Sequence, residues 1–455
     1  IPTHLNSKGI TIRNGHNITV NNLGYTADQL TIATGGTLTL GNNSITLYDG
    51  TGTDLNVAGT LTTTTGQIVA NDPNITINVS GIVNTSDADG LSGTESTTIA
   101  STNSPTVSLI AGSTVNYALN GVQTVTGELD YSNLTISGGN TKTTNANIVV
   151  GNDLKVNAGI FEVAENNLTV SGTSTLIGNL SDNNLVGTNS LKSVIFTGGT
   201  LSSSVTSDFS IDGNISVTGG NGTIGQGNVS ITGITTIDAT RTLTINNALG
   251  NKIFGNVTVN GIWTNSANSA ITITGDLTVN AGSTFTSGTG IYTFSGTTKN
   301  ITGSLPTALS IPNVLISGSY TNSVVGGLTI STLLDGSGSL TQGVSSILTY
   351  GGATIPITNL DAATNANTVN YNRNGAQSVF NTTYNTLQLT TSGVKSATGD
   401  IAASSILISG NNTDFITSNQ VDVSGDLIIQ DNAGTTMTFG GNASTLNIGG
   451  NLYIS

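Results

Sequence analysis

The sequence predicts an all-β protein, a right-handed parallel β-helix (β-solenoid) of roughly 20 rungs. Three observations carry this prediction. Short segments that alternate apolar and polar residues recur at regular intervals, turns rich in Gly and Asn separate them, and only 7% of the 455 residues are charged. Alternation is the period of a strand with one buried face. A regular recurrence of such segments is typical of the stacked turns of a coil.

The alternating segments form series with regular spacing. One series begins at Ile10, Leu30, Leu55 and Ile75. Later segments repeat in the same way, from 134–136 to 154–156 and from 257–259 to 277–279. The spacing implies a coil of roughly 20 to 25 residues per turn, within the range known for solenoids. In such a coil, each series is expected to form a column of parallel strands whose apolar residues face the interior.

A dipeptide that begins with Gly opens many of these segments. The opener precedes six of them: Gly213-Asn214, Gly227-Asn228, Gly255-Asn256, Gly275-Asp276, Gly327-Leu328 and Gly425-Asp426. Gly and Asn tolerate positive φ angles better than other residues. We therefore expect the openers to form the corners of the coil, where the backbone turns from one face to the next.

A longer block occurs twice. Thr114–Tyr117 has the same sequence as Thr368–Tyr371, and further positions match at a nearly constant offset, among them Asn120-Gly121 with Asn374-Gly375, Gln123 with Gln377, Tyr131 with Tyr384, Leu134 with Leu387, and Lys142 with Lys395. Chance periodicity does not produce such a match. The block predicts an internal duplication within the coil.

The expected domain organisation is one continuous solenoid over residues 1–455. Loops or subdomain junctions are expected near 85–106, 302–313 and 354–367, where the alternation weakens and where most of the six Pro residues lie. Pro is excluded from the interior of a sheet. A string of antiparallel β-sandwich modules is the alternative architecture, because turn signals alone suit both.

Composition excludes several classes of function. The net charge is −14 with only ten Lys plus Arg, scattered singly, so no nucleic-acid partner is expected. No apolar run approaches the roughly 18 residues needed to span a bilayer, so no membrane insertion is expected. Neither His4 with His16 nor Asp238 with Arg241 forms a catalytic set, and the chain is not expected to be an enzyme.

No cofactor is expected, with one weak exception. The segment Asp87-Ala-Asp89-Gly90 resembles the opening of a calcium loop, in which alternate carboxylates wrap a hard cation. The rest of the calcium-loop signature is absent. Asp87 and Asp89 are therefore calcium candidates, and an ordinary surface turn is the alternative.

The ends of a solenoid are the candidate self-assembly sites, because an open end leaves strand edges unpaired. Strand-like alternation continues to the last residues, and no capping helix is evident. Subunits are expected to join end to end or by strand donation; a capped monomer and an excised fragment are the alternatives. The residues expected to carry this contact are Ile1, Leu5, Leu446, Ile448, Leu452 and Ile454.

The Gly-Asn-Val-Thr-Val phrase at Gly255–Val259 and the Thr-Val-Asn-Tyr blocks at 114–117 and 368–371 resemble secreted bacterial parallel β-helix surface proteins. This broad class includes filamentous-haemagglutinin-like adhesins. The resemblance implies a secreted bacterial protein, extracellular or on the outer cell surface, whose partners are further copies of itself and cell-surface glycans.

The expected function is a structural subunit of a cell-surface filament, sheath or biofilm-matrix fibre. An adhesin stalk or binding module is the alternative, and a polysaccharide-active enzyme ranks third. The chain begins at Ile1 without Met, as a cleaved signal peptide or a trimmed sequence would leave it.

Overall fold

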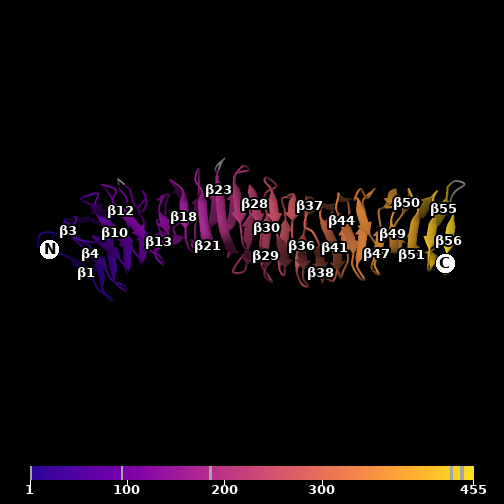
Figure 1. Ribbon diagram of the computed structural model, residues 1–455, viewed down its shortest axis with the longest axis horizontal. Helices are drawn as coiled ribbons and strands as arrows, with labels where there is room; N and C mark the ends of the chain where they lie inside the picture. Colours follow the sequence, from indigo (N-terminus) through magenta and orange to yellow (C-terminus); the bar gives the residue numbers. More distant parts are fainter. Residues whose placement is uncertain (1–2, 94–95, 184–186, 431–433, 441–444) are drawn as a thin grey trace. The chain divides into compact units, whose positions relative to one another are not determined.

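A computed structural model of the chain describes residues 3–93, 96–183, 187–430, 434–440 and 445–455 (Figure 1). Its regular structure consists of short strands, and the described residues contain no helix. The strands stack in parallel to form a β-solenoid of about 21 turns. The predicted fold class and number of rungs are therefore confirmed, and antiparallel sandwich modules are excluded.

Contacts between residues divide the chain into two units, Ile1–Ser230 and Ile231–Ser455. Each unit by itself consists of parallel strands from successive turns, as its strand pairs show. The prediction of one continuous solenoid over residues 1–455 concerns how these units join, and it stays a prediction.

The first unit begins with three strands per turn. Its first turn contains β1 (Ile10–Ile12), β2 (Asn17–Thr19) and β3 (Tyr25–Ala27), and each of them pairs in parallel with a strand of the next turn. Figure 1 labels β1, β4 and β10, three strands of one sheet, in the indigo part of the ribbon. The partners in the following turns are β4 (Leu30–Ile32), β5 (Thr37–Gly41), β6 (Ile45–Leu47), β7 (Leu55–Val57), β8 (Thr60–Thr63), β9 (Ile68–Ala70), β10 (Thr76–Val79), β11 (Ile82–Thr85), β12 (Thr106–Leu109) and β13 (Thr114–Tyr117).

The second unit is built in the same way. For example, β32 (Asn256–Val259) pairs in parallel with β35 (Leu277–Val279), the equivalent strand of the next turn. The last turns contain three parallel columns, again made of strands from successive turns. They are formed by β51 (Ile401–Ile408), β52 (Thr413–Thr417), β53 (Val421–Val423), β54 (Leu427–Ile429), β55 (Thr436–Phe439), β56 (Leu446–Ile448) and β57 (Leu452–Ile454).

The observed register agrees with the predicted spacing except at one turn. Ile10 pairs with Leu30, and Leu30 pairs with Leu55, as predicted. Leu55 then pairs with Ile77 rather than Ile75. Side chains at alternate positions on a strand lie on the same face, so this slip leaves Ile77 and Val79 fully buried in the interior.

Columns of Gly allow the turns to approach closely at some corners. Gly159, Gly178 and Gly199 occupy equivalent corners in three successive turns. A Cβ atom on Gly199 would overlap the carbonyl oxygen of Gly178, and one on Gly178 would collide with the carbonyl oxygen of Gly159. Only Gly fits at position 199, because the backbone of the preceding turn leaves no room for a side chain.

The Gly openers are explained more often by this close approach than by the positive φ angle predicted from the sequence. Gly227 and Gly327 do have positive φ, at 95° and 91°. Gly255 does not, and a Cβ atom there would overlap the carbonyl oxygen of Gly233 in the turn before it. The same holds for Gly213 and Gly275, where the added atom would meet the backbone or a side chain of the preceding turn.

The Asn or Asp of the opener links one turn to the next. The backbone N–H of Asp276 donates to Oδ1 of Asn256 at 2.8 Å, and the N–H of Asn300 donates to Oδ1 of Asp276 at 2.7 Å. In the first unit, Asn133, Asp153 and Thr173 form an equivalent ladder. Each side chain thus satisfies a corner N–H of the following turn, a group that the strand ladder does not reach.

The duplicated blocks contain the same buried hydrogen-bond network. The hydroxyl groups of Tyr117 and Tyr131 lie 2.6 Å apart, and those of Tyr371 and Tyr384 lie 2.8 Å apart. In both blocks the first hydroxyl accepts a backbone N–H and the second donates to the carbonyl of that same residue, which is Thr126 in one block and Phe380 in the other. The sequence match therefore reflects a shared interior structure.

Gln and Lys complete this network in both copies. Nε2 of Gln123 donates to the carbonyls of Thr85 and Asp87, and Nε2 of Gln377 donates to those of Tyr350 and Gly352. The paired lysines are buried, and both donate Nζ to backbone carbonyls: Lys142 to Gly121 and Gly139, and Lys395 to Arg373. The interior thus contains polar groups that are hydrogen-bonded, which is what makes their burial tolerable.

Replacing Gly199 by Ala should lower the free energy of unfolding by about 1–3 kcal/mol, because the added methyl group overlaps the backbone of the preceding turn. Gly151 is the matched control, since it lies in the same unit without positive φ and a Cβ atom there meets nothing closer than 3.7 Å. Gly151→Ala should be neutral or slightly stabilising. Thermal denaturation of both variants measures the difference, and equal midpoints would contradict the close-approach explanation.

Stability should rise with pH between about 8 and 10. Burial lowers the pKa of Lys252 and of Lys395 to about 8, below the ordinary value of 10.5 that both recover on unfolding. The unfolded chain therefore binds more protons in this window, so the free energy of unfolding increases as the pH is raised. Above this window the trend reverses, because burial raises the pKa of Tyr371 and Tyr384 and unfolding releases their protons.

Thermal midpoints measured at pH 7.5, 8.5 and 9.5 test this prediction. The double variant Lys252→Met/Lys395→Met should lose most of the rise. Lys155→Met, at an exposed position, is the control and should keep it. The same increase in the double variant as in the wild-type chain would rule out the two buried lysines as its source.

Candidate functional site

Among the described residues, no group of three or more His, Asp or Glu side chains could hold a metal ion. Asp238 and Arg241 belong to one turn, in which the backbone N–H of Arg241 donates to the carbonyl of Asp238 at 3.0 Å. His4 stacks on Tyr48 with the ring centres 3.7 Å apart. No helix in the described part of the chain is long and apolar enough to cross a membrane.

The calcium candidates Asp87 and Asp89 lie in one turn but differ in exposure. The Asp87 carboxylate is buried and accepts the backbone N–H of Asp89 at 3.0 Å, whereas Asp89 is exposed. Burial raises the pKa of Asp87, and this effect outweighs the hydrogen bond from Asp89. The structure accounts for Asp87 by its role in the turn, and calcium binding stays an untested hypothesis.

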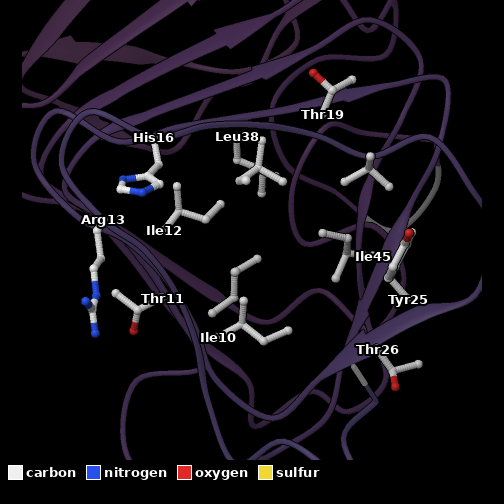
Figure 2. Close-up of a pocket in the computed structure, with 13 residues that line it drawn as sticks. Ile10, Thr11, Ile12, Arg13, His16, Thr19, Tyr25, Thr26, Leu38 and Ile45 are labelled. Carbon is white, nitrogen blue, oxygen red and sulfur yellow. The ribbon is translucent and has the colours of Figure 1, made fainter. Parts of the chain in front are cut away.

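Residues of the first and second turns line an apolar cavity of about 500 Å³ that is open on one side. Figure 2 shows Ile10, Ile12, Leu38 and Ile45 around this cavity, with Arg13 and His16 at one side. In later turns the equivalent interior is filled, and residues such as Leu55 and Ile77 are fully buried. In the first turn, Ile18 of β2 remains 46% exposed. The first turn therefore presents interior side chains that no further turn covers in the described residues.

Among the described residues, the backbone of β1 is hydrogen-bonded to another strand along one edge only, the edge that faces β4. Ile10 donates its N–H to the carbonyl of Gln29 at 2.8 Å, and the carbonyl of Ile12 accepts the N–H of Ala33 at 2.9 Å. In a parallel ladder, alternate residues direct their polar groups to opposite edges. The N–H and C=O of Thr11 therefore point to the outer edge of β1, where they are positioned to pair with another strand.

The last turn presents the opposite edge. Leu427 of β54 donates its N–H to the carbonyl of Asn451 at 2.9 Å, and Ser455 donates to Ile429 at 3.2 Å. The N–H and C=O groups of Leu452 and Ile454 therefore point away from β54. The side chains of these two residues are 50% and 70% exposed. They continue the interior columns of Leu427 and Ile429.

The residues predicted for self-assembly have different environments. Ile1 lies outside the described residues. Leu5 is 85% exposed, but it lies in a turn before β1, in which Ser7 donates its backbone N–H to the Thr3 carbonyl. Leu446 and Ile448 of β56 are half-buried. Leu452 and Ile454 are the most exposed of the four C-terminal candidates.

The sequence analysis did not single out Arg13 or Asn451, and it considered His16 only as a member of a catalytic set. Arg13 and His16 line the cavity of the first turn. Asn451 occupies the ladder position described above, since its N–H donates to Oδ1 of Asp426 at 2.9 Å. A comparison of each corner Asn or Asp with its equivalents in other turns would have identified Asn451 as the last member of a ladder.

Opposite charges collect at the two ends of the sequence. Residues 1–27 contain Lys8, Arg13 and both His residues, and they contain no Asp or Glu. Residues 396–455 contain five Asp and no Lys, Arg, His or Glu. Of these five, Asp431 lies outside the described residues. Asp28 follows the basic segment directly, and the described residues of the last turn, 434–440 and 445–455, contain no charged side chain, so the four described Asp lie on earlier turns.

These features define the class of the protein as a parallel β-solenoid whose first and last described turns have open edges. No family model, curated protein or solved structure matches the chain.

Proposed function

We propose that the protein is an extracellular structural protein, a subunit of a cell-surface filament, sheath or matrix fibre that assembles through its open end turns. The observation that carries this proposal is the pair of exposed edges, with the apolar cavity at the first turn and the exposed Leu452 and Ile454 at the last. Exposed strand edges in a folded protein are templates for pairing with another chain.

The composition supports a structural role. Charged residues are rare, and the polar residues that face solvent are mainly Thr, Asn and Ser. Repeated turns with a continuous interior give stability that grows by the addition of similar units. The same architecture extends naturally when a further turn is supplied by another copy of the chain.

The adhesin-like identity and the bacterial, secreted location belong to this proposal and rest on the resemblance of the repeats. Cell-surface glycans are the partners proposed beside further copies of the chain, and no enzymatic activity is proposed. An adhesin stalk that presents a separate binding tip is the alternative, and it shares the solenoid but does not need the end turns to associate.

Electron microscopy of the purified chain tests the proposal. The wild-type protein should form fibres of uniform width at high concentration. The variant Leu452→Lys/Ile454→Lys should remain dispersed, because it places two charges at an edge that must become dry when another turn stacks on it. Its matched control is Tyr453→Lys, which adds a charge on the same strand at the outward-facing position between them.

The control should still form fibres. Dispersed particles from the wild-type chain at every concentration would contradict the assembly function. Fibres from the double variant that equal those of the wild type would show that the last turn is not the contact surface.

A further inference from the structure

We propose that Asn120 is a modification site, at which the side-chain amide cyclises onto the backbone nitrogen of Gly121 and is then hydrolysed to a carboxylate. The inference concerns the interior of the first unit and is independent of the proposed assembly. Gly after Asn favours this reaction, because it has no side chain to obstruct the approach and its backbone bends freely. The sequence contains five Asn-Gly pairs, which begin at Asn14, Asn120, Asn221, Asn260 and Asn374.

The reaction needs only water and hydroxide. The N–H of Gly121 gives its proton to hydroxide, and the nitrogen attacks Cγ of Asn120. A C–N bond forms, and the side-chain nitrogen leaves as ammonia after it takes a proton from water, which regenerates the hydroxide. Water then opens either carbonyl of the cyclic imide. The product is Asp or an isoaspartyl residue whose main chain runs through Cγ, and both carry a carboxylate that is ionised at neutral pH.

Both reacting groups are free at Asn120. The side chain is exposed, and among the described residues neither its amide nor the N–H of Gly121 has a hydrogen-bond partner. The side chain lies beside Gly139 of the next turn, where an added Cβ atom would come within 2.7 Å of Oδ1 of Asn120. The carbonyl of Gly139 accepts Nζ of Lys142 at 2.5 Å rather than the N–H of Gly121.

The duplicated block supplies a matched pair in which the same groups are held. Asn374 is exposed like Asn120, and it too precedes a Gly. There the N–H of Gly375 donates to the carbonyl of Ser392 at 3.0 Å, and the hydroxyl of Ser392 donates to Oδ1 of Asn374. Ser392 is the counterpart of Gly139, because each stands three residues before the lysine that the two blocks share. The exchange of Ser for Gly therefore removes a hydroxyl that holds the Asn side chain.

The other Asn-Gly pairs are also restrained. The N–H groups of Gly15 and Gly261 donate to carbonyls of neighbouring turns, at 3.0 and 3.2 Å. Gly222 is buried. A hydrogen bond to the attacking nitrogen or to the amide must be broken before the imide can form, which raises the barrier. Asn120 is therefore expected to convert before the other four.

Peptide mapping of the intact chain tests this expectation. The folded protein is kept in mildly alkaline buffer and digested at intervals, and mass spectrometry measures Asp and isoaspartyl products at each Asn-Gly pair. Asn120 should convert at least about tenfold faster than Asn374, because two hydrogen bonds must first be broken at Asn374. In the chain unfolded by urea the two sites should convert at similar rates, since the contacts that distinguish them are lost.

Two variants exchange the difference between the blocks. Gly139→Ser supplies the missing hydroxyl and should slow the conversion of Asn120 several-fold; its φ is not positive, and the nearest atom to the added Cβ belongs to the movable Asn120 side chain. Ser392→Ala removes the hydroxyl from the second block and should speed the conversion of Asn374, while Asn120 keeps its rate. Thermal midpoints close to that of the wild type show that each variant is folded.

Equal rates at Asn120 and Asn374 in the folded chain, or a faster rate at Asn374, would overturn the proposal. It would also fail if Asn120 stayed intact in the folded chain under buffer conditions that convert it in urea. An unchanged rate at Asn120 in the folded Gly139→Ser variant would contradict the role given to the missing hydroxyl. None of these outcomes depends on whether the chain assembles.

Discussion

The structure depends on one constraint: each turn of the chain must lie directly on the turn before it, with its strands parallel and in register. The backbone ladders satisfy the polar groups of the strands, and the apolar side chains stack into a continuous interior. The corners obey the same constraint. Gly199 is needed where two turns approach closely, and Asn256 and Asp276 satisfy corner N–H groups that no strand reaches.

The same constraint distinguishes the inner turns from the first and last described turns. An inner turn has its interior and both edges covered by its neighbours, so it offers only solvated outer faces. The first and last described turns have such a neighbour on one side only among the described residues, and some of their interior side chains are exposed there. The cavity beside Ile10 and Ile12 and the exposed Leu452 and Ile454 are two results of this one cause. The proposed assembly uses the same ladders and columns that hold the turns together.

The buried polar residues show how the interior departs from a simple apolar column. The Tyr117–Tyr131 and Tyr371–Tyr384 pairs bridge neighbouring positions inside the coil, and Lys142 and Lys395 reach corner carbonyls. Each group is hydrogen-bonded, so its burial is tolerated. The recurrence of the network in both duplicated blocks links a sequence repeat to a specific three-dimensional arrangement, and it places a titratable lysine, Lys395, where pH affects stability.

By itself, the sequence determined the strand period, the approximate length of a turn, the parallel fold and the duplication, because these follow from local alternation and from repeats along the chain. Only the tertiary structure decided that Leu55 pairs with Ile77 and that the turns approach too closely at position 255 for any residue but Gly. It also decided which residues form the corner ladder that includes Asn451. These depend on distances between residues of different turns, and stacking creates those distances. The cavity near Arg13 and His16 was hidden for the same reason, since residues of two successive turns line it.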